Sequence, residues 1–224
     1  MSLIRKTLLA SVLVLGSFSA AHADLATGPF TVTVWNGNGI TDSAALPPPT
    51  SQPLATFTYT GPIDFINNAP NNGQNTSLNT FADFFGSYTS GISNFVSLSS
   101  QTEAQFLATT MSLEGFQYNT YMTLSGTYTA SSGTQVSVSH DDGASLYTGA
   151  NNANTVFTSA SPTSEVTNTG LVPAGSDSPF TLVYVESNGS PADLTMSVPE
   201  PGSLAMLGLG LVMFGFVLRR RRNV

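Results

Sequence analysis

Short apolar and β-branched runs recur along most of the chain, and clusters of Pro, Asn, Gly and Ser separate them. Runs rich in β-branched and aromatic residues between turn formers are typical of β-strands. They predict strands at residues 30–35, 55–60, 121–130, 134–140, 154–159, 180–187 and 192–198. Seven or more short strands predict an all-β fold, an antiparallel β-sandwich.

The run TQVSVSH at residues 134–140 shows the alternation most clearly. A period of two places Val136, Val138 and His140 on one face of the strand and polar residues on the other. This strand is therefore expected to be half buried. After a turn at Asp141-Asp142-Gly143, Leu146 and Tyr147 are expected to restart a strand. The predicted core includes Val136, Val138, Leu146, Phe180, Leu182 and Tyr184.

Between the strands the pattern changes to polar loops and two short helices. The loops are expected at residues 46–53 and 67–77, where Pro, Asn and Gly are frequent. Helices are expected at residues 78–85 and 102–109, with Thr102 as the predicted N-cap of the second helix.

The N-terminus has the three parts of a secretory signal peptide in the right order. Arg5 and Lys6 precede an apolar run, and the small-residue pattern Ala21-His22-Ala23 follows it. This order predicts a signal peptide at residues 1–23, cleaved before Asp24, and favours it over a buried N-terminal helix. The mature protein is therefore expected to be exported.

The C-terminus combines Pro199-Glu200-Pro201 with an apolar run at residues 204–218 and a basic end, Arg219 to Arg222. As a helix the apolar run would measure about 23 Å, less than the roughly 30 Å hydrocarbon core of a bilayer. Arginines that snorkel can complete the span, and the positive-inside rule keeps them cytoplasmic. Residues 204–218 are therefore predicted to cross a membrane, with the main domain outside the cytoplasm.

This order of features resembles the PEP-CTERM sorting signal of exopolysaccharide-producing Gram-negative bacteria. The resemblance implies that an exosortase-type membrane transpeptidase recognises Pro199, Glu200 and Pro201 and removes the helix. The protein would be anchored in the membrane transiently and then transferred to the cell surface or extracellular matrix. A plain membrane anchor is the alternative. The predicted parts are a signal peptide at residues 1–23, a β-sandwich at 24–198 and the sorting signal at 199–224.

Charge is distributed very unevenly along the chain. All 6 Lys and Arg residues lie in the two end segments, and the net charge is −7. Without basic side chains the middle of the chain cannot neutralise phosphates, which excludes nucleic acid as a partner. An acidic domain can attract cations and hydrogen-bond neutral partners such as sugars. Because the chain has no Cys, stability must come from the core or from a bound ion.

The central part of the chain carries a second resemblance, clearest over residues 120–198. It is similar to the protective-antigen-type domain, a β-sandwich shared by a bacterial toxin subunit, flocculins and modules of glycosidases. The family's motif positions are here Gly126, Tyr128, Asp141, Asp142, Gly143, Ala144, Leu146 and Tyr147. Thr148 departs from the pattern, since many members have an acidic residue there. The resemblance implies carbohydrate binding or adhesion. In the flocculin branch an Asp pair joined by a cis peptide binds a calcium ion that also holds sugar hydroxyls.

Asp141 and Asp142 form the predicted metal site. Calcium takes about six to eight oxygen ligands, which two carboxylates, backbone carbonyls, Asn side chains and water can supply. The neutral contributors are expected to be Asn151, Asn152 and Asn154, which lie nearby in the sequence. The alternative is that Asp141-Asp142-Gly143 is only a turn, because Asp and Gly are favoured in turns for backbone reasons.

Catalytic chemistry has little support in the sequence. His140 is the only histidine left after removal of the signal peptide, so neither a zinc site nor a Ser-His-Asp triad is indicated. The paired carboxylates of a glycosidase are the weaker alternative. The candidates for that role are Asp64, Asp83, Glu103, Glu114 and Glu186. The sequence therefore predicts a protein that is not an enzyme.

Two non-enzymatic functions stay open. The first is a carbohydrate-binding or adhesion module, with exopolysaccharide or another glycan as partner and Trp35 and Tyr147 as candidate exposed aromatics. The second is a structural matrix or surface-coat protein, whose many Ser, Thr and Asn residues suit glycosylation.

Overall fold

The computed structural model describes residues 28–67, 80–113, 115, 117–131 and 133–198. The predicted signal peptide, the predicted sorting signal and most of the loop expected at residues 67–77 lie outside this part. Asp24–Pro199 forms one compact unit. Within the described ranges, no helix has the length and apolar character needed to cross a membrane.

The described chain folds into two sheets in which every pair of neighbouring strands is antiparallel. The larger sheet has 7 strands in the order β4 (Ile92–Ser97), β2 (Ala55–Tyr59), β1 (Phe30–Asn38), β5 (Tyr118–Ala130), β10 (Gly175–Glu186), β7 (Gly143–Thr148) and β8 (Asn154–Ser159). The smaller sheet has 4 strands in the order β3 (Asp64–Asn67), β11 (Ala192–Ser197), β6 (Thr134–Asp141) and β9 (Val166–Val172). The all-β prediction is confirmed, as are all 7 predicted strands and the strand expected to restart at Leu146 and Tyr147, which is β7; β3, β4 and β9 were not predicted.

The two sheets pack over one shared core. On β6 the residues Val136 and Val138 are fully buried, while Gln135 on the opposite face is exposed, as the alternation predicts. Each residue of the predicted core is buried: Val136, Val138, Leu146, Phe180, Leu182 and Tyr184. Burial of these side chains contributes about 1.5–3 kcal/mol each to folding. A sandwich without disulfides is thus stabilised by its apolar interior.

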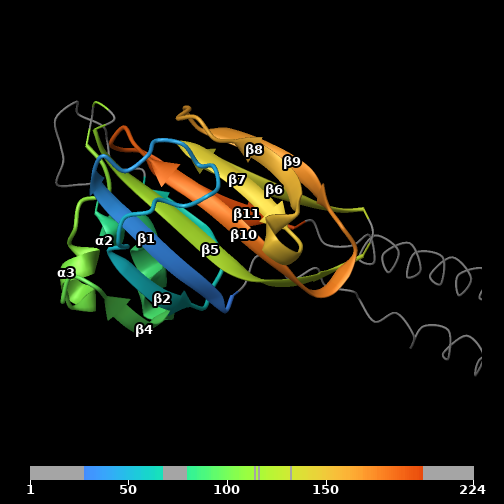
Figure 1. Ribbon diagram of the computed structural model, residues 1–224, viewed down its shortest axis with the longest axis horizontal. Coiled ribbons are helices and arrows are strands. Elements are labelled where there is room, and N and C mark those ends of the chain that lie inside the picture. The colour runs from blue at the N-terminus through green and yellow to red at the C-terminus, as the bar shows by residue number, and fades with distance from the viewer. Residues whose placement is uncertain (1–27, 68–79, 114, 116, 132, 199–224) are drawn as a thin grey trace, which may run out of the picture. The chain divides into compact units, whose positions relative to one another are not determined.

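Two short helices close one end of the core, beside β2 and β4 (Figure 1). Helix α2 (Phe81–Phe85) and helix α3 (Glu103–Leu107) both begin with a capping box, at Thr80 and Thr102 respectively. The predicted N-cap Thr102 is therefore confirmed. Their aromatic residues pack on β2, where the Phe57 ring lies 5.9 Å from that of Phe85 and 5.6 Å from that of Phe106.

The loop at residues 39–54 covers part of the outer face of the larger sheet. Trp35, Ala44, Tyr121, Val183 and Val185 form a small second core beneath it. The Trp35 indole donates a hydrogen bond to the Ser51 carbonyl at 2.9 Å. The expectation of an exposed Trp35 is therefore wrong, because this loop buries its ring. Tyr147 packs partly buried against the same cluster.

The chain passes from the smaller sheet to the larger one at Asp142, between the end of β6 and the start of β7. At this corner the backbone of Gly143 lies close to the backbone of Ala160, just after β8. A Cβ atom there would lie only 2.7 Å from the carbonyl oxygen of Ala160. The glycine therefore allows the sharp passage between sheets that brings Asp141 and Asp142 to the edge of the sandwich.

Candidate functional site

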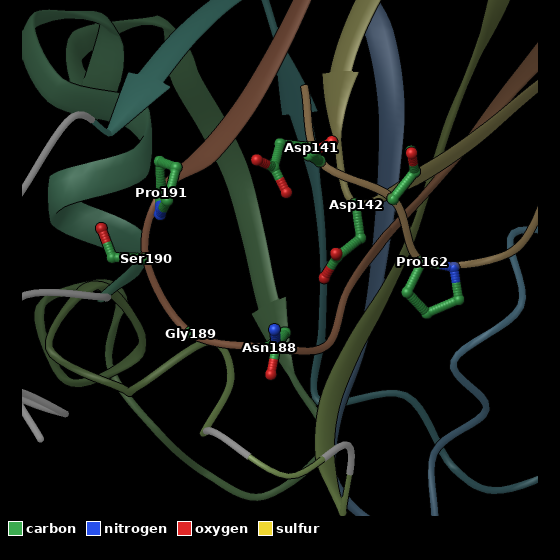
Figure 2. A pocket seen from close by; sticks show the side chains of 9 residues that line it. Asp141, Asp142, Pro162, Asn188, Gly189, Ser190 and Pro191 are labelled. Carbon is green, nitrogen blue, oxygen red and sulfur yellow. The ribbon is translucent and has the colours of Figure 1, made fainter. Parts of the chain in front are cut away.

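A polar hollow of about 320 Å³ lies at this edge of the sandwich. This Asp pocket is bounded by the end of β6, the connection between β8 and β9, and the connection between β10 and β11. Its lining residues are Asp141, Asp142, Pro162, Thr163, Ser164, Asn188, Gly189, Ser190 and Pro191. Figure 2 shows the carboxylates of Asp141 and Asp142 pointing toward the space that Asn188 and Pro191 face from the other side.

Asp142 is fixed by the backbone around it. The Asp141–Asp142 peptide bond is cis. The Asp142 Oδ2 atom accepts a hydrogen bond from the Ser187 amide at 2.8 Å, and only 5% of the residue is exposed. Burial raises the pKa of the Asp142 carboxyl, and hydrogen bonds from the backbones of Ser187, Asn188 and Thr163 oppose that effect. The amide donors therefore hold the carboxylate in place at the wall of the pocket.

Asp141 carries the clearest electrostatic perturbation in the pocket. Burial, followed by the charges of Asp142 and Asp193, raises the pKa of its carboxyl to about 7. Asp193 lies directly across from it in the register of β11 and β6. The described chain contains no Lys or Arg that could neutralise these acids. A bound cation would relieve this repulsion, because an opposite charge nearby stabilises a carboxylate.

His140 lies behind the pocket, and its ring is fully buried. Its Nδ1 is 2.7 Å from the Asp142 carbonyl oxygen, and its Nε2 is 2.8 Å from the Asn168 amide nitrogen. A carbonyl can only accept and an amide nitrogen can only donate, so the imidazole is neutral with its proton on Nδ1. Burial lowers the pKa of this histidine, in agreement with that assignment. His140 therefore supports the backbone of Asp142 from within the core and does not face the pocket.

The structure does not bring Asn151, Asn152 and Asn154 to the Asp pair. Asn154 pairs with Thr148 at one end of β7, and the Asp pair adjoins Gly143 at the other end. The length of β7 separates them by about 17 Å, at about 3.4 Å per residue. The structure instead places Asn188 on the pocket wall, from the turn after β10. The Asn188-Gly189 pair after a predicted strand was the sequence signal that could have indicated this.

The carboxylates considered for glycoside hydrolysis have other surroundings. Asp64 accepts a hydrogen bond from Tyr88 at 2.9 Å, Asp83 closes the capping box of α2, and Glu103 is in the first turn of α3. Glu186 is fully buried in β10, and Glu114 lies outside the described residues. None of the four described acids lines the Asp pocket.

Metal-ligating side chains are sparse as well. Over the ranges that the structure describes, no group of 3 or more His, Cys, Asp or Glu residues lies close enough to hold a metal ion. A cation in the Asp pocket would therefore depend on two carboxylates supplemented by neutral oxygen atoms, which is a ligand set for calcium rather than for zinc.

Residues 197–222 match the family model described as the PEP-CTERM protein-sorting motif. The match includes Pro199, Glu200 and Pro201 and confirms the resemblance found at this end of the chain. A chain with this signal is an exported, cell-surface protein that an exosortase processes. No curated protein matches the chain in sequence.

Several solved structures are similar to the chain. The PA14 domain of MpAFP antifreeze protein is 14% identical with a TM-score of 0.48, over 81% of this chain and 86% of that chain. The PA14 sugar-binding domain from an RTX adhesin is 16% identical with a TM-score of 0.48, over 78% and 92%. The A domain of epithelial adhesin 6 from Candida glabrata, in complex with Galβ1-3GlcNAc, is 13% identical with a TM-score of 0.34, over 81% and 84%. With TM-scores this low, none of these similarities assigns a ligand to this chain.

Proposed function

We propose that this exported protein binds a glycan at the cell surface or in the extracellular matrix through a calcium ion held by Asp141 and Asp142. The observation that supports the proposal is the Asp pocket itself. Two carboxylates face one open hollow in a domain that has no basic residue to pair with either of them. Such a pair is costly to ionise unless a cation joins it.

The pocket offers fewer oxygen ligands than a calcium ion accepts, so a bound calcium would keep coordination positions open. Asp141 and Asp142 supply carboxylate oxygens, and Thr163 and Ser164, which also line the pocket, carry hydroxyl and carbonyl oxygens that are candidate neutral ligands. Calcium accepts about six to eight oxygens in flexible geometry, so this side of the pocket leaves positions for an external ligand. Two neighbouring hydroxyls of a sugar are suitable ligands, and the Asn188 amide across the pocket can hydrogen-bond a further hydroxyl.

Charge indicates which glycans fit. An acidic polysaccharide usually needs Arg or Lys for its carboxylates, and none is present between the two end segments. A neutral glycan needs only hydroxyl, amide and metal partners. We therefore infer a neutral exopolysaccharide or surface glycan as the partner, with the surface-coat role as the alternative if no glycan binds.

The proposed route to the surface follows from the sorting motif. The signal peptide at residues 1–23 directs export, and residues 204–218 anchor the protein in the membrane transiently. An exosortase-type transpeptidase then acts at Pro199-Glu200-Pro201, in a Gram-negative cell that produces exopolysaccharide.

Calcium titration calorimetry on the compact unit, residues 24–199, tests the site. We expect calcium uptake by the wild type at millimolar ion or below, and its loss in Asp142→Asn, which removes a charge but little volume. Asp42→Asn is the matched control, because Asp42 is exposed on the loop away from the pocket. A neutral-glycan array should then give binding with calcium and none with a chelator. Absence of calcium uptake by the wild type would reject the site and leave the surface-coat role.

A further inference from the structure

A chain of buried polar groups runs behind the Asp pocket and connects its two sides. The Gly189 amide donates to the Ser112 hydroxyl at 3.0 Å, and that hydroxyl donates to Glu186 Oε1 at 2.9 Å. Glu186 Oε2 lies 3.0 Å from the Tyr184 hydroxyl, which donates in turn to the Asp141 carbonyl. Both Gly189 and Asp141 line the pocket, whereas Glu186 and Tyr184 are fully buried.

The number of protons in this chain determines the state of Glu186. The Tyr184 hydroxyl has one proton, and the Asp141 carbonyl can only accept, so that proton points to Asp141. The contact between Tyr184 and Glu186 Oε2 is then a hydrogen bond only if Oε2 itself carries a proton. At the other oxygen, Ser112 donates. A neutral carboxylic acid at Glu186 therefore satisfies every contact, while a carboxylate would leave one of them without a proton.

The surroundings agree with a neutral acid. No Lys or Arg lies in the described chain, so an ionised Glu186 would be a buried charge without a counter-ion. Burial, followed by the charge of Asp142, raises the pKa of the Glu186 carboxyl well above its usual range.

We propose that Glu186 is a positioning residue of the Asp pocket, a neutral acid whose hydrogen bonds hold the Asp141 backbone and the Gly189 turn at a fixed separation. It touches neither the ion nor the sugar and acts through Tyr184 and Ser112. This role deepens the proposed function and rests on it where ligand affinity is concerned. Gly189 has a φ of +86°, a conformation that other residues rarely adopt, and its anchored amide keeps this turn beside the pocket.

Two substitutions separate a neutral acid from a carboxylate. Glu186→Gln keeps the volume, accepts from Ser112 through its oxygen and donates to Tyr184 through its amide. Glu186→Leu removes the contacts of Glu186 with both Ser112 and Tyr184. We expect Glu186→Gln to bind calcium within about twofold of the wild type, and Glu186→Leu about tenfold more weakly, which corresponds to about 1.4 kcal/mol.

Ser112→Ala provides a second test in case Glu186→Leu fails to fold. It removes the hydroxyl that connects Glu186 to the Gly189 amide and alters the side-chain volume less. It should weaken calcium binding about threefold to tenfold, the effect of one or two lost hydrogen bonds. Thr148→Val is the matched control. Thr148 is fully buried at the far end of β7, and its hydroxyl has no partner in the described chain. Calcium binding should be unchanged in this variant.

Two readouts test Glu186 without any ligand. Infrared spectra at pH about 9, where an Asp141 carboxyl with a pKa of about 7 is ionised, should show the carbonyl stretch of a protonated carboxyl in the wild type, and Glu186→Gln should lack that band. The Gly189 amide resonance should keep its chemical shift in Glu186→Gln and change in Ser112→Ala. If the wild type takes up no calcium, the proposed function fails while these two readouts still decide the state and contacts of Glu186. A missing carboxyl band, or calcium binding weakened equally by Glu186→Gln and Glu186→Leu, would overturn the positioning role.

Discussion

At the scale of single residues, the domain places several acids in or behind one pocket without a basic partner. Burial is the largest cause that raises the pKa of Asp141, Asp142, Asp193 and Glu186. Most proteins pair such groups with Arg or Lys, and this chain has neither between its two ends. Ionisation of these unpaired carboxyls therefore lowers the stability of the folded protein, and the same carboxylates attract cations.

The stability of the metal-free domain should consequently fall as the pH rises from about 4 to about 7. An unfolded Asp titrates near pH 3.9, whereas the folded pKa of Asp141 is about 7, so the folded state holds more protons in that window. Where the folded state binds more protons, stability decreases with pH, and the contribution of Asp141 is constant above pH about 7. Thermal melts in chelator at several pH values measure this, and Asp141→Asn should flatten the slope. Stability that increases from pH 5 to pH 8 would contradict the argument.

At the scale of elements, the sequence was informative wherever a strand buries one face. The strands β1, β5, β6, β7 and β10 lie inside their sheets and pack on the core. Alternation identified β6, and runs of β-branched and aromatic residues identified β1, β5 and β10. The strands that were not predicted, β3, β4 and β9, are all edge strands. An edge strand has one neighbour and less burial, so its sequence is less constrained; β4 alternates only weakly, with Val96 exposed and Phe95 partly buried.

Of the candidate site, the sequence predicted the Asp pair but not the opposite wall of the pocket. Asp141 and Asp142 lie next to each other in the sequence, and their place at the end of a strand was readable from TQVSVSH. The opposite wall comes from residues more than 40 positions later, and only the pairing of β10 with β7 brings it there. Proximity along the sequence had instead indicated Asn151, Asn152 and Asn154 as the neutral ligands. These residues lie at the opposite end of β7, and the sequence alone did not show where that strand runs relative to the Asp pair.

The corner between β6 and β7 allows a test at this scale. Gly143→Ala should lower the free energy of unfolding by about 1–3 kcal/mol, because its Cβ would meet the Ala160 backbone and the strands would have to move. Gly126→Ala is a suitable comparison. There the nearest atoms are ring carbons of Phe180 and Phe30 at 3.2 Å, which can shift, so the loss should be smaller. Urea denaturation of both variants measures the difference, and equal stability losses would refute the role of the corner.

At the scale of the whole molecule, the charge distribution follows the sorting scheme. All Lys and Arg residues lie at positions 5, 6 and 219 to 222, so removal of the two ends leaves a domain with acidic residues alone. Such a domain is soluble through self-repulsion and draws divalent cations toward its surface. In the proposed sorting scheme, the basic residues serve targeting and membrane orientation, and the acidic domain is the part that functions outside the cell.

Intact-mass analysis of protein extracted from the cell surface tests this division of the chain. We expect a mature form that begins at about Asp24 and lacks Arg219 to Arg222, because the signal peptide and the sorting helix are both removed. Substitution of Pro199-Glu200-Pro201 by alanines should retain the C-terminal segment, since the recognition motif is lost while the apolar run and the arginines remain. Such a variant should fractionate with membranes and keep the mass of the C-terminal 26 residues, numbers 199–224. Wild-type surface protein that still contains Arg219 to Arg222 in most of its population would show that the segment is a permanent anchor, held by its helix and snorkelling arginines, and not a removable signal.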